Sequence, residues 1–206
     1  MIKRAIEERI HSALAKKKAV TIMGPRQVGK STLADAIIPK DAKVLEINGD
    51  STDVQTMFVN VDEAKMKVLI GNKNFLFVDE AQKIENVGNM LKIVAEKFKD
   101  VKIIVTGSSA FKLAEAVNES LTGRKREFRL YPLTFKEMAD DTSVLEESRM
   151  IDHRLIYGYY PEVVTSPGDE KEVLKELIDS YLYKDVMEEN NIAKPDKLVK
   201  LVQALA

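Results

Sequence analysis

The segment GPRQVGKST, Gly24 to Thr32, restricts the possible folds of this chain of 206 residues more than any other part of the sequence. It matches the pattern G-x-x-x-x-G-K-S/T, in which the two glycines are Gly24 and Gly29. The apolar run Ala19 to Met23 precedes it and is typical of a buried strand, whereas the residues after it have helical spacing. A strand before and a helix after are the context in which this pattern forms a phosphate-binding loop, so we predict such a loop here.

The residue types of this loop suit a nucleotide. Glycines let the backbone curl so that successive N–H groups point inward at a phosphate, and the N-terminus of the next helix adds its dipole. We expect Lys30 to reach the β- and γ-phosphate oxygens and the Ser31 hydroxyl to bind Mg²⁺. Thr32 is one residue beyond that role and is also expected to pack or hydrogen-bond locally. The predicted nucleotide-binding residues are Gly24, Pro25, Arg26, Gln27, Val28, Gly29, Lys30, Ser31 and Thr32.

An acidic pair follows the apolar run FLFV further along the chain. Asp79 and Glu80 would stand at the carboxyl end of a buried strand, which is the edge where ligands bind in open α/β sheets. We expect Asp79 to hold Mg²⁺ through its hydration water and Glu80 to orient the water that attacks the γ-phosphate. A solvated acidic pair in a loop is the alternative interpretation.

The segment IIVTGSSAF predicts another strand, and a hydroxyl at its end is a candidate sensor of the γ-phosphate. Among Thr106, Ser108 and Ser109 we select Ser108, because Thr106 is expected to remain in the strand and pack. Capping of a helix by Ser108 or Ser109 is the alternative. Gln82 is expected either to face the site or to begin a surface helix.

Four basic residues gather in the segment LTGRKREFRL. Arg124, directly after Gly123, is the candidate for a phosphate-sensing arginine, acting in cis or in trans. The plainer interpretation is a solvated edge strand of alternating charge. A nucleic-acid patch is a third, although four basic residues are by themselves a weak signal.

Apolar runs alternate with helical patterns up to about residue 133. Strands are expected at residues 19–23, 43–47, 74–79 and 101–107, with a fifth within 125–133. An N-terminal apolar stripe with a period of four predicts a helix packed on the same domain (Ile2, Ile6, Ile10 and Leu14). The alternation predicts an α/β domain with a parallel sheet that helices cover on both faces.

From Phe135 onward only helical patterns remain. Helices are expected at 135–139, 144–157 and 170–189, with a turn at YGYYPE, and another begins at Pro195 and carries an apolar stripe without a final cap. We therefore divide the chain into a core with its N-terminal helix (1–133), a helical lid or linker (134–170), and the start of a C-terminal helical domain (171–206). The uncapped stripe favours a chain that is part of a longer protein.

Composition excludes several other classes of protein. The chain has no cysteine, so disulfides, cysteine-zinc sites and thiol catalysis are ruled out, and two histidines make a histidine-rich metal site improbable. The formal net charge of −1 does not indicate a globally basic nucleic-acid binder. No apolar run is long enough to span a bilayer, and the N-terminus has no signal-like core, so we expect a cytoplasmic protein without a membrane partner.

Several motifs occur together in an order that resembles a known family. GPRQVGKST, FLFVDEAQKI, IIVTGSSAF, the series from LTGR to LYPLTFKEM, and YGYYPEVV are similar to the AAA-type ATP-binding proteins of bacteria and archaea that carry a C-terminal domain of unknown function. The resemblance implies binding of Mg-ATP and a P-loop fold with an additional strand, in which Glu80 beside Asp79 is catalytic. The sequence departs from the family at Tyr157, where a glycine before Gly158 is usual.

These observations favour ATP hydrolysis coupled to movement of the helices after Leu133. The alternative is a slow nucleotide-gated switch or scaffold that acts through a partner or through a further C-terminal domain, with a nucleic acid or a protein as the partner. Phosphoryl transfer to a small molecule is less favoured, because Glu80 suits water activation. A guanine-binding motif of the Asn-Lys-x-Asp kind is missing from the sequence, so ATP is preferred to GTP. The sequence leaves the oligomeric state open.

Overall fold

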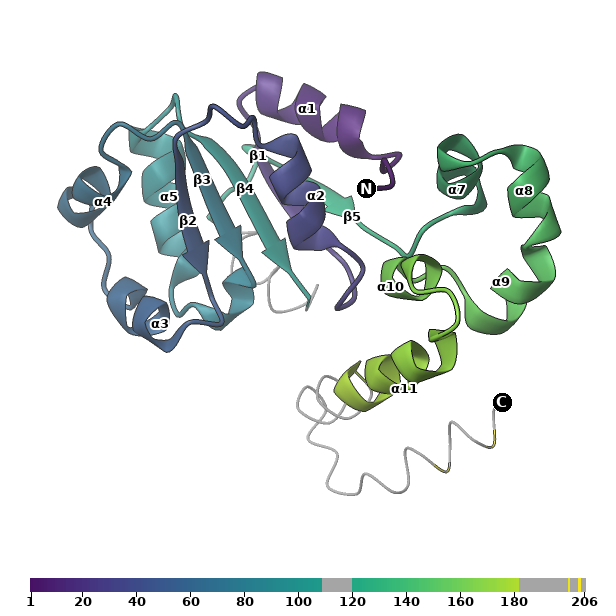
Figure 1. Cartoon of the computed structure of the whole chain (residues 1–206). Helices are drawn as coiled ribbons and strands as arrows, with labels where there is room; N and C mark the ends of the chain where they lie inside the picture. Colours follow the sequence, from purple (N-terminus) through teal and green to yellow (C-terminus); the bar gives the residue numbers. More distant parts are fainter. Residues whose placement is uncertain (109–119, 182–199, 201–203, 205–206) are drawn as a thin grey trace.

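Five parallel strands form one sheet in the order β2-β3-β4-β1-β5 (Figure 1). The computed structural model describes residues 1–108, 120–181, 200 and 204. The strand β4 lies between β1 and β3, in agreement with the P-loop fold with an additional strand that the resemblance implied. The strands are β1 (Ala19–Met23), β2 (Val44–Asn48), β3 (Phe75–Asp79), β4 (Lys102–Gly107) and β5 (Lys125–Arg129).

Alternate residues of the central strands face opposite sides of the sheet, as the pleat requires. On β3, Phe75 and Phe77 belong to one buried cluster, whereas Leu76 and Val78 belong to the other. Because both sets are apolar, the strand reads as a continuous apolar run in the sequence. Both faces of the sheet are therefore buried, as predicted.

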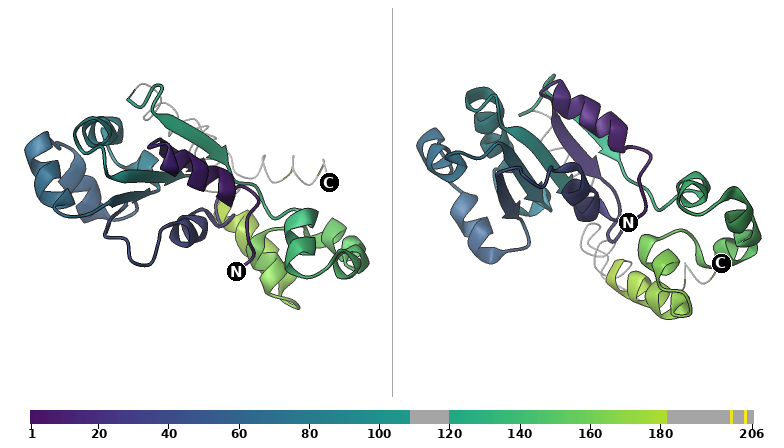
Figure 2. Two further views of the ribbon diagram at one scale, coloured as in Figure 1. Left: turned by 90° about the horizontal axis from the view of Figure 1, so that it is seen from above. Right: turned by 45° about the horizontal axis from the view of Figure 1, so that its top comes forward.

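Two groups of helices cover these faces (Figures 1 and 2). The helices α1 (Glu7–Ala15) and α2 (Lys30–Ile37) pack on one face, with Ile10 and Leu33 nearly inaccessible to solvent. The other face is covered by α3 (Thr52–Phe58), α4 (Glu63–Ile70) and α5 (Val87–Lys97). A short 3₁₀ turn, η1 (Ala81–Lys83), follows β3.

A region of short helices follows β5. It comprises α7 (Phe135–Asp141), α8 (Val144–Arg149), α9 (Ile151–Tyr157), α10 (Pro161–Thr165) and α11 (Glu170–Tyr181). The predicted single helix over 144–157 is wrong, because the chain turns at Met150. This bend lets Arg154 in α9 form a buried ion pair with Glu147 in α8, with 3.0 Å between Nε and Oε1. Helical periodicity does not report a contact made across a bend between two short helices.

A small apolar cluster joins the last described helices. Val163 of α10 packs with Val173 and Leu177 of α11, and Tyr157 and Tyr160 lie against them. The predicted boundary at residues 170–171 falls within α11, directly after its first residue, Glu170. The predicted helical continuation to residue 189 and the helix from Pro195 lie outside the described residues, apart from Lys200 and Ala204.

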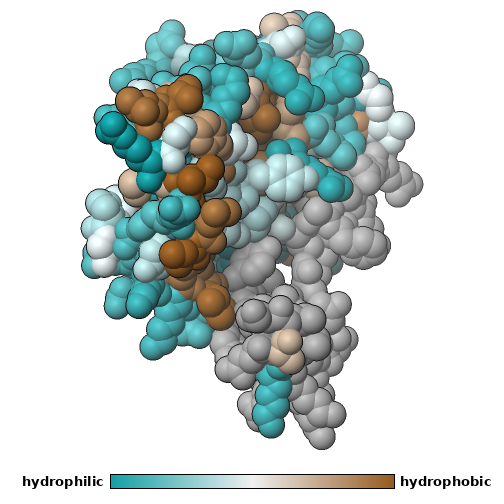
Figure 3. Space-filling model, turned by 90° about the vertical axis from the view of Figure 1, so that its right-hand side faces the viewer, coloured by the Kyte–Doolittle hydropathy of each residue, from teal (hydrophilic) through white to brown (hydrophobic). Residues whose placement is uncertain are grey.

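The helical region carries exposed apolar side chains. Figure 3 faces this side of the molecule and shows hydrophobic residues gathered on it. The exposed large apolar residues of α8, α9 and the bend between them are Val144, Leu145, Met150, Ile151, Leu155 and Ile156. Among the described residues, no helix combines the length and the apolarity that crossing a bilayer requires.

Candidate nucleotide-binding site

The loop between β1 and α2 is curled by backbone conformations that its sequence permits. Gly29 has φ of +91° and Gln27 has φ of +57°, both in the left-handed region. Gly24 lies close to the backbone that follows β5. A Cβ on Gly24 would stand 2.2 Å from the carbonyl oxygen of Leu130. The Val28 side chain, in contrast, is fully buried in the core, so only its backbone borders the loop.

Lys30 closes the loop on itself. Its Nζ donates hydrogen bonds to the carbonyl oxygens of Gly24 (3.1 Å) and Pro25 (2.9 Å) and lies 3.7 Å from Glu80 Oε1. Burial lowers the pKa of the Lys30 ammonium below its ordinary value, and the charges of Glu80 and Asp79 oppose this shift. The ammonium is thus held at the loop among groups that it can exchange for phosphate oxygens.

Ser31 and Asp79, the two residues predicted to bind Mg²⁺, lie in contact at the carboxyl end of the sheet. Ser31 Oγ donates to Asp79 Oδ2 at 2.8 Å, and Thr106 Oγ1 donates to Asp79 Oδ1. A hydroxyl beside a carboxylate is a hard oxygen pair of the kind that binds Mg²⁺ with water and phosphate as the remaining ligands. The residues present therefore fit this ion.

Glu80 sits in a small hydrogen-bonded network. Its Oε2 accepts from Ser108 Oγ (2.9 Å) and from Gln82 Nε2 (2.5 Å), and Gln82 Nε2 also donates to Ser108 Oγ (3.0 Å). Gln82 Oε1 is buried and has no hydrogen-bond partner among the described residues, so it can accept from a water molecule. The structure thus brings Ser108 and Gln82 together at the carboxylate predicted to activate water.

Glu80 itself has an unusual backbone. Its φ of +46° lies in the left-handed region, which is uncommon for a residue with a side chain. Gly49, after β2, packs directly on this turn: its N–H donates to the Asp79 carbonyl at 2.8 Å, and a Cβ on it would lie 2.3 Å from the Glu80 carbonyl oxygen. The position of Glu80 therefore depends on a glycine that sequence analysis did not select.

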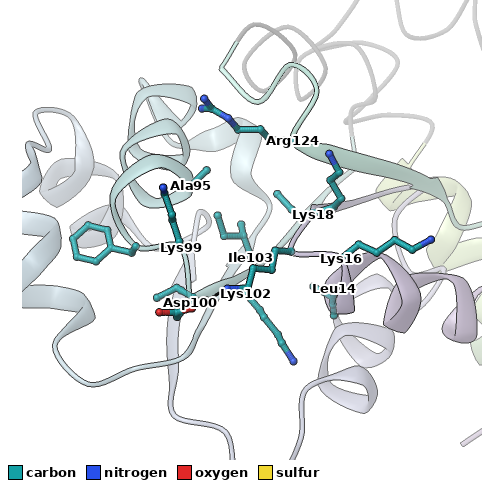
Figure 4. Close-up of a pocket in the computed structure, with 13 residues that line it drawn as sticks. Leu14, Lys16, Lys18, Ala95, Lys99, Asp100, Lys102, Ile103 and Arg124 are labelled. Carbon is teal, nitrogen blue, oxygen red and sulfur yellow. Dashed lines mark hydrogen bonds and ion pairs between the residues drawn. The ribbon is translucent and has the colours of Figure 1, made fainter.

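Arg124 lies at the other edge of the sheet, which corrects its predicted role in cis. Ala19, the first residue of β1, donates its N–H to the Arg124 carbonyl at 2.9 Å, whereas the phosphate loop follows the last residue of β1. The guanidinium pairs with Glu96 at 2.7 Å and lines a pocket of about 160 Å³ with Lys16, Lys18, Lys99 and Lys102 among others (Figure 4). A role in trans stays a prediction.

Two further residues near the loop take part in the site or border it. Thr106, a candidate sensor that was set aside in favour of Ser108, holds Asp79 through its hydroxyl, and its Oγ1 also accepts from the Glu80 N–H at 3.2 Å. Arg129 ends β5 beside Met23 and lines a pocket with Gly24 and Ser108. A polar residue at the end of an apolar strand was the available signal for Thr106.

Two clefts border the loop, between the core and the helical region. One, of about 420 Å³, lies between the loop with Glu80 on one side and Pro161, Glu162 and Thr165 of α10 on the other. The second, of about 550 Å³, is mostly apolar and is lined by Ile2, Leu33, Leu133 and Met138 among others. Gly29 and Thr32 line both clefts, so the two spaces meet at the phosphate loop.

Comparison with known families identifies the domain that contains this site. Residues 16–139 match the AAA domain, which includes the sheet, the loop and Asp79 with Glu80. This chain belongs to the AAA domain family. Residues 148–206 match a domain of unknown function (DUF8612), so the AAA domain is followed by a C-terminal domain of unknown function, as the motif series implied.

Curated relatives of this AAA domain protein are described as uncharacterized proteins. One from Methanocaldococcus jannaschii is 28% identical over 206 residues, covering 92% of this chain and 46% of the relative. Another, from Haemophilus influenzae, is 29% identical over 139 residues, covering 65% of this chain and 34% of the relative. The chain thus spans less than half the length of these two relatives.

Solved structures share the fold of this AAA domain protein. A Walker-type ATPase of Pyrococcus abyssi superposes with a TM-score of 0.63 and 16% identity, over 95% of this chain and 77% of that structure. A signal transduction ATPase with numerous domains from Pyrococcus horikoshii gives a TM-score of 0.55 and 13% identity, over 87% of this chain and 32% of that structure. At these identities the likeness shows the fold.

Proposed function

We propose that this chain binds Mg-ATP at residues Gly24 to Thr32 and hydrolyses it to ADP and phosphate. The observation that carries the proposal is the meeting of three functions at one sheet edge: Lys30 on the loop, the Ser31–Asp79 oxygen pair, and Glu80. These are the groups that phosphate binding, metal binding and water activation require.

Each group then has a defined task. Lys30 exchanges its bonds to Gly24 and Pro25 for β- and γ-phosphate oxygens, while Ser31 and Asp79 hold Mg²⁺. When bound, the ion neutralises charge that develops on the phosphate oxygens. Glu80 accepts a proton from the attacking water, and Ser108 and Gln82 keep its carboxylate in place.

The base of the nucleotide is proposed to occupy the apolar cleft of about 550 Å³ beside Leu33 and Leu133. That cleft adjoins the phosphate loop at Gly29 and Thr32 and combines apolar side chains with a few polar ones, among them Arg4 and Arg154, as ligand pockets do. Because residues of the helical region line the same cleft, nucleotide occupancy would move that region. This cleft is the physical basis for coupling turnover to the helices after Leu133.

A slow switch is the second candidate, and one observation favours it. Glu80 is already engaged by Lys30, Ser108 and Gln82, so its carboxylate must give up contacts before it can serve a water molecule. In that case nucleotide binding would change how the C-terminal region interacts with a partner, which is a protein or a nucleic acid.

Steady-state phosphate release from Mg-ATP, measured beside equilibrium ATP binding, tests the proposal. Glu80→Gln should lower turnover by about 100-fold or more and retain binding, because removal of a general base costs that much. The matched control is Glu85→Gln, an identical change on an exposed carboxylate outside the site. Binding without turnover in the unchanged chain would favour the switch, and absence of ATP binding would refute both.

A further inference from the structure

Arg4 connects three parts of the chain that are distant in sequence. Its side chain is 8% exposed and lies between the phosphate loop, the segment after β5 and helix α7. Nη1 donates to the Val28 carbonyl at 3.0 Å, Nη2 to the Tyr131 carbonyl at 2.5 Å, and Nε to Glu137 Oε1 at 3.2 Å. A buried guanidinium is costly unless its donors are used, so this degree of pairing indicates a fixed position.

The contact with Val28 fixes one peptide group of the loop. The Val28 carbonyl and the Gly29 N–H belong to the same planar trans peptide, so they point in opposite directions. Holding the carbonyl oxygen on Arg4 therefore turns the Gly29 N–H away from Arg4. The positive charge on the carbonyl side also polarises the peptide and makes its N–H a stronger donor.

The contact with Glu137 connects the same guanidinium to the helical region. Glu137 is 6% exposed, and its Oε1 also accepts from the Ala5 N–H at 2.8 Å. Its Oε2 accepts from the Thr134 N–H at 2.9 Å, so the carboxylate caps α7 as well. Any movement of the first turn of α7 is therefore transmitted to Arg4.

We infer that Arg4 is a positioning residue that presents the Gly29 N–H to a nucleotide phosphate and couples this loop to the helical region through Glu137. The inference rests on the proposed nucleotide binding. Coupling between two sites is reciprocal. A nucleotide that accepts a hydrogen bond from the Gly29 N–H therefore shifts the position of α7, and a displaced α7 weakens nucleotide binding.

Calorimetric titration with MgADP, which needs no hydrolysis, tests the first half of the inference. The double variant Arg4→Met with Glu137→Gln removes the donors and leaves no unpaired buried charge. It should bind MgADP about tenfold more weakly, because the Gly29 N–H is no longer held in the direction of the phosphate. Glu137→Gln alone keeps the bond from Arg4 to Val28 and should stay within about threefold of the unchanged chain. Lys3→Gln, an exposed neighbour, is the control and should not alter affinity.

Two further readouts separate positioning from a general loss of structure. The amide resonance of Gly29 in ¹⁵N–¹H spectra without nucleotide should shift in the double variant and remain in place in Lys3→Gln. The chain has no cysteine, so spin labels at Lys92→Cys and Leu155→Cys can report the distance between the exposed surfaces of α5 and α9. MgADP should change that distance in the unchanged chain and change it less after Glu137→Gln.

The outcomes of the proposed function and of this inference are distinguishable. If the unchanged chain binds neither MgADP nor Mg-ATP, the proposed function fails, and the inference fails with it. If it binds MgADP, but the folded double variant binds equally well and the Gly29 resonance is unshifted, only the role of Arg4 is overturned.

Discussion

At the scale of single residues, the chemistry depends on the contacts that orient Asp79 and Glu80. These two carboxylates follow a buried strand, but their exact direction is set by Gly49 and Thr106, which come from the ends of the neighbouring strands β2 and β4. Substitutions at these two positions should therefore change turnover without touching the phosphate loop.

Gly49→Ala should lower ATP turnover by about tenfold or more, because small misplacements of a catalytic group are costly. The added methyl group would stand 2.3 Å from the Glu80 carbonyl oxygen and 3.1 Å from that of Asp79, so the turn has to shift. The affinity for ADP without Mg²⁺ should change little, since the phosphate loop is not involved. Phosphate release and ADP titration measure the two effects, and equal losses in both would contradict this account.

Thr106→Val should raise the Mg²⁺ concentration that gives half-maximal turnover by about tenfold, as loss of a residue that orients a metal ligand commonly does. The valine has a similar shape but cannot donate to Asp79 Oδ1. Thr106→Ser keeps the hydroxyl and should restore the original Mg²⁺ dependence. A serine variant as impaired as the valine variant would show that packing, and not the hydrogen bond, is what matters.

At the scale of elements, helix α7 anchors the helical region on the core. Its first turn has a capping box in which the Thr134 side chain accepts from the Glu137 N–H and Glu137 accepts from the Thr134 N–H. Thr134→Ala should lower the free energy of unfolding by about 1 kcal/mol. Urea denaturation measures this change. Thr56→Ala, an exposed position inside α3, should cost clearly less.

The same helix makes stability depend on pH. Burial of Glu137 opposes its ionisation, but hydrogen bonds from the Ala5 and Thr134 N–H groups and the charge of Arg4 outweigh burial, so its pKa lies below the ordinary 4.5. A depressed carboxyl pKa stabilises the fold above the unfolded value and loses this contribution as the pH falls through the folded value. The unchanged chain should thus lose more stability than Glu137→Gln between pH 5 and pH 3, roughly the range in which such carboxyls titrate. Parallel denaturation curves in acid would contradict this prediction.

At the scale of the whole molecule, the two edges of the sheet have separate roles. The carboxyl edge carries the loop, Asp79 and Glu80, whereas Arg124 lies at the amino edge beside Glu96. Arg124→Gln should therefore leave turnover at low protein concentration within about twofold, as expected for an exposed residue remote from the site. If the variant lowers turnover only as protein concentration rises, Arg124 acts in trans on a neighbouring copy. A large loss that is independent of concentration would contradict its placement.

Much of the fold followed from local patterns in the sequence. Apolar runs identified β1 to β4 to within one residue, and the glycine spacing of residues 24–29 identified the loop. The fifth strand, whose segment is charged, was expected within 125–133 and lies at Lys125–Arg129. The bend at Met150 could not be predicted, because it depends on a buried pair between Glu147 and Arg154. The helix α10 was not predicted, since five residues are too few to show a period, and the turn expected at YGYYPE covers only its first two residues.

The sequence by itself determined that the chain has a phosphate loop and a parallel sheet, because a motif and a periodicity are properties of neighbouring residues. Only the tertiary structure decided which distant side chains meet: Thr106 with Asp79, Ser108 with Glu80, and Arg4 with Glu137. It also separated Arg124 from the loop. Such pairings depend on the order of the strands in the sheet and on where a helix returns to the core. The free energy that stabilises them comes from burial and hydrogen bonding between residues that no local pattern connects.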